Sequence, residues 1–177
     1  MKSISGIKEI NKIIRNALIK QSGLSSSNVL NALSLHGEDL DKKLRKQYYG
    51  SYETNESVLL FELNSRQSTS NTSFTDDDDK IVYYRSFTVS VTLYGDDSSD
   101  IASNIVARLR TADSKLALYG DGIYLEAVSE PTTLNEYKNE TMWIRNDIEL
   151  SLSCYLSIEQ VEPSQPFDST TIIIKEQ

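Results

Sequence analysis

Carboxylates form the most reactive-looking cluster in this sequence. Four consecutive aspartates run from Asp76 to Asp79 and are followed by Lys80. Such a run could bind a divalent cation, but calcium loops space their ligands and use a glycine for the sharp turn. Adjacent aspartates mostly repel one another and stay hydrated. We therefore interpret residues 76–79 as a solvated run that leads into the next strand, and predict no metal site there.

A second acidic group contains Asp96, Asp97 and Asp100. A nuclease-like magnesium site would need further carboxylates or a lysine converging from another strand. The same aspartates can accept hydrogen bonds from the free amides at the start of a helix, and they suit the positive end of its dipole. We favour capping, and keep a metal-dependent enzyme that uses Asp96 and Asp100 as the alternative.

Other arrangements typical of catalysis are missing from the sequence. His36 is the sole histidine and Cys154 the sole cysteine, so neither has a like partner for a metal site, a relay or a disulfide. The segment Gly120-Asp121-Gly122 is too short to hold phosphates and is typical of a turn. We expect no catalytic, cofactor-binding or metal-binding residues, and Cys154 as a plain core residue.

Charge is distributed unevenly along the 177 residues, whose formal net charge is −8. The first 20 residues carry five basic side chains against Glu9, which gives +4 and leaves −12 for the remainder. Because affinity for a phosphate backbone depends on dense Lys and Arg, an acidic body is a poor nucleic-acid ligand. The basic N-terminal segment could touch DNA or an acidic partner, although we favour a solvated helix face. No apolar run approaches the length of a membrane span, and we expect a soluble protein made in the cytoplasm.

Hydrophobic periodicity predicts the elements. Apolar residues alternate with polar ones over 81–93 and 144–158, which is typical of half-buried strands. Shorter strands are expected at 58–63 and 123–127, the latter closed by Pro131. Helical spacing predicts an opening helix that ends near Ser22-Gly23, a second short helix within 25–44, and a third over 101–116 that packs on the sheet through Ile101, Ile105, Leu109 and Leu116.

These elements predict an α+β fold. We expect a mainly antiparallel four-stranded sheet with helices packed on one face, in the order α-(α)-β-β-α-β-β, followed by an extended C-terminal arm. Residues 1–161 form one domain, residues 64–80 a projecting polar loop, and residues 162–177 the arm.

Three segments are candidate interaction surfaces. Clustered tyrosines can anchor an interface, and equally can be an ordinary loop packed on the domain. A β-branched run after a proline-broken linker suits strand addition to a sheet of the same or a neighbouring subunit. The candidate interface residues are Tyr48, Tyr49 and Tyr52 in the tyrosine cluster, Phe74, Asp76 and Asp77 in the polar loop, and Ile172, Ile173 and Ile174 in the arm.

The passage from Phe87 to Tyr155 contains a series of short motifs in a fixed order. They are Val91-Thr92-Leu93-Tyr94-Gly95, the 102–109 helix with Arg108, Leu116-Ala117-Leu118-Tyr119-Gly120-Asp121-Gly122-Ile123-Tyr124, Val128-Ser129-Glu130-Pro131 and Trp143-Ile144-Arg145-Asn146-Asp147-Ile148-Glu149-Leu150. In this order and spacing the chain resembles the neck or tail terminator (tail completion) proteins of tailed bacteriophages. Its 24–56 segment and long polar loop depart from the compact pattern of that family.

The resemblance implies a virion structural protein without catalytic residues. Proteins of this kind are small α+β subunits that assemble into a six-fold ring at the head-proximal end of the tail, in the neck of a virion assembled in the host cytoplasm. The implied partners are further copies of the chain, the tail tube protein, the head-tail connector or adaptor and, in contractile tails, the sheath protein. No membrane and no sequence-specific nucleic acid are implied, although DNA would pass through the ring. Another head-tail joining or adaptor protein is the alternative.

Overall fold

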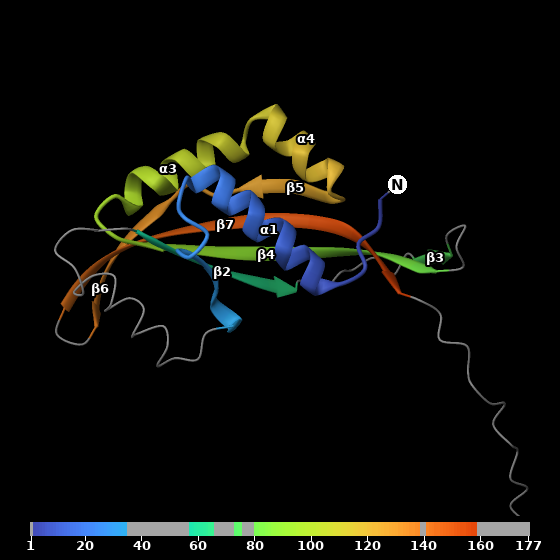
Figure 1. The fold of residues 1–177 in the computed structure, drawn as a ribbon, viewed down its shortest axis with the longest axis horizontal. Helices are drawn as coiled ribbons and strands as arrows, with labels where there is room; N and C mark the ends of the chain where they lie inside the picture. Colours follow the sequence, from blue (N-terminus) through green and yellow to red (C-terminus); the bar gives the residue numbers. More distant parts are fainter. Residues whose placement is uncertain (1, 35–56, 66–72, 76–79, 139–140, 159–177) are drawn as a thin grey trace, which may run out of the picture.

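The structure is a computed structural model that describes residues 2–34, 57–65, 73–75, 80–138 and 141–158. The expected α+β class is confirmed, and within these ranges the structure has three α-helices and a mixed sheet of seven strands (Figure 1). The elements are α1 (Ile7–Ser22), β1 (Val29–Asn31), the 3₁₀ turn η1 (Ala32–Ser34), β2 (Val58–Ser65), β3 (Ser73–Thr75), β4 (Ile81–Tyr94), α3 (Ser98–Leu109), α4 (Ala112–Gly120), β5 (Ile123–Val128), β6 (Thr132–Lys138) and β7 (Thr141–Ile158). None of the helices in these ranges has the length and hydropathy needed to cross a bilayer.

The two long strands predicted from alternation form the centre of the sheet. β4 and β7 pair antiparallel along the whole of β4, from Ile81 opposite Ile158 to Tyr94 opposite Arg145. The sheet order is β1-β2-β4-β7-β5, with β3 on β4 and β6 on β7. All pairs are antiparallel except β1 with β2. The expectation of four strands was therefore too low, because it lacked β1, β3 and β6.

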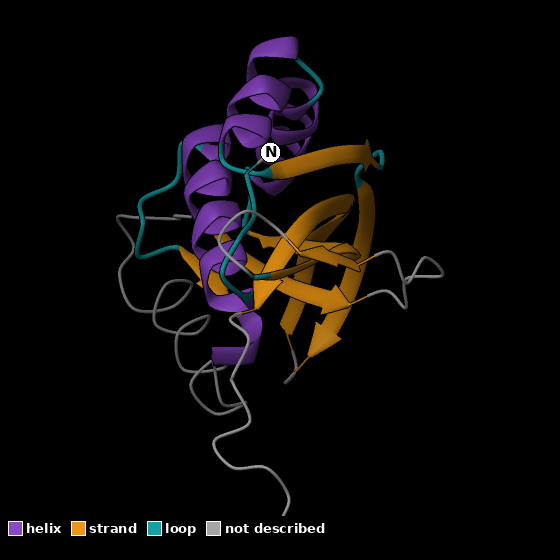
Figure 2. Cartoon of the chain, turned by 90° about the vertical axis from the view of Figure 1, so that its right-hand side faces the viewer, coloured by secondary structure: helices purple, strands orange, loops and turns teal. Residues whose placement is uncertain are grey.

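Alternation gives the sheet two different faces. The face covered by α1 and α3, here called the inner face, contains the core, and α1 crosses over β4 and β7 (Figures 1 and 2). Opposite residues such as Phe87 with Leu152 and Val89 with Leu150 are buried there. Each large apolar side chain buried in this way contributes about 1.5–3 kcal/mol before chain entropy is subtracted. No described helix lies on the opposite, outer face.

The opening helix forms as predicted. Ile10, Ile14 and Leu18 bury its apolar stripe. The helix ends where Gly23 adopts φ 72°, which glycine does without steric cost, and donates its N–H to the carbonyl of Ile19 at 3.1 Å. Ile4 lies just ahead of the helix and forms an isolated bridge to Leu156 of β7.

The second predicted helix is wrong where the structure describes it. Val29 to Asn31 form β1, parallel to β2, and the N–H of Leu59 donates to the carbonyl of Asn28 at 2.8 Å. A β-branched residue beside an open sheet edge gains more from strand pairing than from a short helix. Leu33, expected on the apolar stripe, is exposed in η1. Residues 35–44 of that prediction lie outside the described residues.

The third predicted helix is broken in two. Thr111 is extended (φ −68°, ψ 151°) and caps α4 by accepting from the N–H of Ser114 at 3.3 Å, while its hydroxyl donates to the carbonyl of Arg108 at 2.7 Å. A threonine hydroxyl that bonds the local backbone competes with helix continuation. The break turns Leu116, predicted to be buried, into a 66% exposed side chain, and Leu118 becomes the buried residue of α4.

Strand β5 ends at Val128, ahead of Pro131, as predicted, but β6 follows Pro131 directly and forms an unexpected hairpin with the start of β7. This hairpin extends beyond the N-terminal end of α3. Ile144, expected in the core, is 41% exposed there, whereas Asn146 is fully buried. The Asn146 amide donates to the Ser98 hydroxyl at 2.8 Å and its oxygen accepts from the Thr133 hydroxyl at 2.7 Å. One buried side chain thus joins α3, β6 and β7.

Asn146→Ala should lower the free energy of unfolding by about 1–3 kcal/mol, because it leaves the buried Ser98 hydroxyl without this donor. Urea unfolding would measure the change. Asn135→Ala is the matched control, since Asn135 is exposed on β6 and should shift stability by less than about 0.5 kcal/mol. Equal losses in the two variants would contradict a structural role for the Asn146 network.

Cys154 lies in the core on the inner face of β7, as predicted, and its thiol is free. Burial raises its pKa to about 11. The folded protein should therefore react very slowly with iodoacetamide at pH 8, because roughly one thiol in a thousand is ionised and that thiol is shielded. Mass spectrometry would follow alkylation, with the urea-unfolded chain as the fast-reacting control. Equal rates in the two states would show that Cys154 is accessible.

Candidate functional site

Of the candidate interface residues, Phe74 is the one that the structure describes. It lies in β3, opposite Val82 of β4, and 45% of it is exposed. Tyr48, Tyr49, Tyr52, Asp76, Asp77, Ile172, Ile173 and Ile174 lie outside the described residues, and their roles stay predictions. The short strand β3 also shows that the expected 64–80 loop contains sheet structure at Phe74.

Phe74 belongs to a row of aromatic rings on the outer face. Its ring centroid lies 6.2 Å from that of Tyr155, which in turn lies 5.5 Å from Tyr84 and 6.4 Å from Tyr124. Tyr119, at the end of α4, continues the row at 5.2 Å from Tyr124. All four pairs meet edge to face, an arrangement worth about 0.5–1.5 kcal/mol per pair beyond area burial. We call these five residues the aromatic strip.

Strand register explains why the strip forms. Tyr84 and Tyr155 are directly opposite in the β4–β7 ladder, and Tyr124 is opposite Ser153, two residues from Tyr155. Since side chains alternate between faces, these tyrosines share the outer face, while Cys154 and Leu156 on either side of Tyr155 enter the core. β5 has a register shift between Leu125 and Ala127.

Polar contacts fix individual rings of the strip. The Tyr84 hydroxyl donates to the Glu126 carboxylate at 2.9 Å. Desolvation, with a smaller contribution from Tyr119, raises the pKa of Tyr124 above its ordinary value. The Tyr124 hydroxyl therefore stays neutral at physiological pH. Tyr119 is 56% exposed and Phe74 45%, so the two ends of the strip are open to a partner.

A charged cluster occupies the other end of the outer face. Arg145 contacts Asp147 at 2.6 Å and Glu136 at 3.4 Å, and the Tyr94 hydroxyl donates to Glu136 at 3.0 Å. The contact with Asp147 is the main reason that the pKa of Arg145 rises, and burial is the main reason that the pKa of Tyr94 rises to about 12. A permanently charged guanidinium and a neutral phenol offer no acid or base near pH 7. The cluster joins β4, β6 and β7.

The alternative metal site does not gain support from the geometry. Asp97 is the N-cap residue of α3, Asp100 lies in its first turn, and both are exposed. Within the described ranges no three His, Cys, Asp or Glu side chains lie close enough to hold a metal ion. The capping prediction is also only partly correct, because the Asp97 side chain makes no capping hydrogen bond.

Comparison with known families gives a direct result. The sequence pattern of the phage neck terminator proteins matches residues 26–176. The chain belongs to this family. No curated protein matches it. The resemblance that the sequence motifs indicated is thus confirmed, and the match also covers the 26–56 segment that departs from the compact pattern. As a phage neck terminator protein, the chain is a structural component of the virion tail or neck, where it contacts other head or tail proteins.

The alternation over 81–93 and 144–158 places Tyr84 and Tyr155 on the polar side of their strands, but sequence reasoning did not recognise them as a site. The signal that could have revealed them is that these two positions, where the alternating pattern calls for small polar side chains, carry large aromatic rings. Tyr119 and Tyr124 contributed only to the family resemblance. Pairing these four residues required the register of β5 against β7 and the end point of α4, neither of which is local.

Tyr155→Ala should lower the free energy of unfolding by about 2–4 kcal/mol, because Tyr155 makes three of the four edge-to-face contacts. Tyr155→Phe is the matched control: it keeps the ring and should cost less than about 1 kcal/mol. Chemical unfolding of both variants would measure the difference. Similar losses would show that the hydroxyl, and not ring stacking, carries the stabilisation.

Proposed function

We propose that this neck terminator protein forms a closed ring of six copies at the head-proximal end of the phage tail. The ring stops polymerisation of the tail tube and presents a surface for the head connector, and in a contractile tail it also engages the last sheath layer. The observation that carries this proposal is the family match over residues 26–176. The absence of recognisable chemistry in the described residues is compatible with an assembly role.

The distribution of charge on the subunit favours head-to-tail contacts between copies, as in a ring, over two-fold contacts. The outer face carries the carboxylates of Glu62, Glu126, Glu136, Asp147 and Glu149, whereas the solvent side of α1 carries Lys8, Lys12 and Lys20. A two-fold interface brings each patch against its own copy, which places like charges together. A head-to-tail interface lets the acidic outer face of one copy meet the basic α1 of the next, and such heterologous interfaces close into rings.

The aromatic strip supplies the apolar part of the proposed contact. Protein interfaces are enriched in tyrosine and phenylalanine, and a few large rings carry most of their binding energy. The strip offers five rings on one face, with Phe74 and Tyr119 exposed at its ends. The 64–80 loop, the tyrosine cluster and the 170–174 run remain further predicted contacts.

Electron microscopy and native mass spectrometry of the purified protein, alone and mixed with tail tube protein, test the function. Rings of six copies, or rings that appear on tube ends, are the expected result. Virions that lack the protein should carry overlong tails. Tails of normal length that fail to join heads would instead identify an adaptor, and the absence of rings under both conditions would overturn the proposal.

The double variant Phe74→Ala/Tyr119→Ala should raise the subunit concentration needed for half-assembly about tenfold or more, because it removes the two exposed ends of the strip. Leu116→Ala is the matched control, since Leu116 is even more exposed than Tyr119 on α4 but lies outside the strip. Analytical ultracentrifugation would measure assembly. Rings that form equally well in both variants would exclude the strip as a subunit contact.

A further inference from the structure

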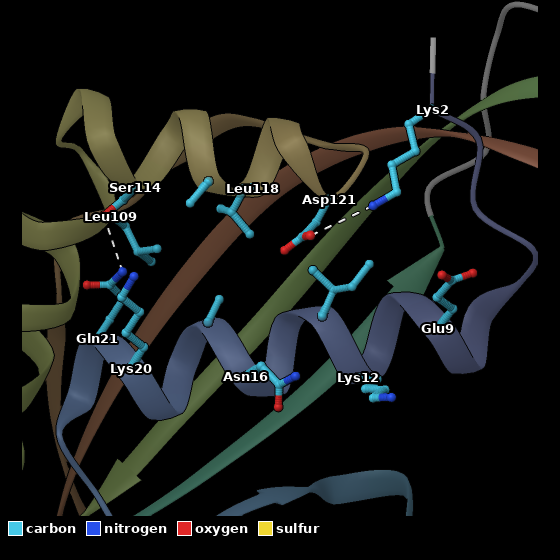
Figure 3. Close-up of a pocket in the computed structure, with 13 residues that line it drawn as sticks. Lys2, Glu9, Lys12, Asn16, Lys20, Gln21, Leu109, Ser114, Leu118 and Asp121 are labelled. Carbon is cyan, nitrogen blue, oxygen red and sulfur yellow. Dashed lines mark hydrogen bonds and ion pairs between the residues drawn. The ribbon is translucent and has the colours of Figure 1, made fainter.

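A groove of about 360 Å³ lies between α1 and α4, away from the outer face (Figure 3). Its floor is apolar: Ile13 and Ala17 come from α1, Leu109 from the end of α3, and Ala117 and Leu118 from α4. The break at Thr111 creates the groove, because it lets α4 lie alongside α1 as a separate helix.

Polar contacts close both ends of the groove. At one end the Gln21 amide donates to the Ser114 hydroxyl at 3.2 Å. At the other end the Lys2 ammonium contacts Asp121 at 3.8 Å and donates to the carbonyl of Gly120 at 3.2 Å (Figure 3). Because these polar contacts limit its length, the groove suits a pair of apolar side chains better than a whole helix. Lys12 and Lys20 also line it, from α1.

We propose that this groove binds the 159–177 segment of the chain itself, through Ile172 and Ile174. Alternate residues of an extended segment point the same way and lie about 6.6 Å apart. On the groove side, Ile13 and Ala17 are four residues apart on a helix, which is about 6 Å along its axis. The two isoleucines therefore match the spacing of the apolar floor.

The charge of the 159–177 segment is also complementary to that of the groove rim. The 159–177 segment contains Glu159, Glu162, Asp168 and Glu176 against Lys175, a net charge of −3. Asp168 and Glu176 flank the isoleucine run, where they can meet Lys12 and Lys20 at the rim while the apolar side chains fill the floor. Residues 21–158 have a formal net charge of −9, whereas residues 1–20 have +4, so the α1 side is the favourable place for this acidic segment.

The path of the chain permits this binding. β7 ends at Ile158, and its last residues lie beside Ile4. The N–H of Ile4 donates to the carbonyl of Tyr155 at 2.8 Å. Lys2, two residues before Ile4, lines the groove. The 13 residues from 159 to 171 can span up to about 43 Å, well beyond the roughly 18 Å that separate Glu9 from Gln21 along α1. The inference does not depend on ring closure.

Disulfide trapping in the full-length protein tests the proposal. Thr170→Cys, on the same side of the extended segment as Ile172, combined with Ala117→Cys in the groove should oxidise at least tenfold faster than Thr170→Cys combined with Lys115→Cys, which lies on the other side of α4. Buried Cys154 serves as an inert background. Non-reducing gels and mass spectrometry separate a link within one chain, which is the expected product, from a link between copies, which would overturn binding of the chain's own segment.

Charge reversal provides the second readout. Lys12→Glu/Lys20→Glu should lower the trapping yield at residue 117 several-fold, whereas Lys8→Glu, on the same helix but outside the groove, should leave it unchanged. Trapping at residue 117 that is no faster than at residue 115 would overturn the proposal, as expected if the segment instead adds a strand to a sheet edge. A yield that is insensitive to Lys12 and Lys20 would also overturn it.

Discussion

The antiparallel ladder between β4 and β7 is the constraint on which the rest of this structure depends. Its register places Phe87, Val89 and Val91 opposite apolar partners on the inner face, and by the same step it places Tyr84 opposite Tyr155 on the outer face. A slip of one residue would exchange the two faces along the entire ladder. Core formation and surface presentation are therefore not independent in this protein, since the bonds that bury one set of side chains also display the other.

Local sequence patterns account for the parts of the fold that were predicted. Alternation over 81–93 and 144–158, and the stripe of α1 closed by Gly23, reflect interactions between near neighbours in the chain. The parts that were missed depend on distant partners. Val29 becomes a strand because β2 offers an edge, and β6 forms because β7 extends far enough to pair with it. The break at Thr111 depended on a hydroxyl whose capping bond outweighs a continuous apolar stripe.

The candidate site shows the same division between local and distant information. Phe74 could be named from its isolation in a polar segment, but the rings around it become neighbours only through the register of β3, β4, β5 and β7. The tyrosine cluster at 48–52 and the isoleucines at 172–174 could be recognised by composition alone, and they stay predictions. Family membership gives such exposed rings a use, because a phage neck terminator protein contacts other head or tail proteins.

Helix α4 contributes to both the groove and the aromatic strip, although few contacts hold it to the rest of the subunit. A single buried side chain, Leu118, fastens it to the core, while Ser114 and Asp121 tie it to α1 and to the N-terminal segment. One of its sides walls the groove, and Tyr119 at its end belongs to the aromatic strip on the opposite face. Ala117 in the groove and Tyr119 in the aromatic strip are two residues apart on this short helix, so one element carries contacts to both faces of the subunit.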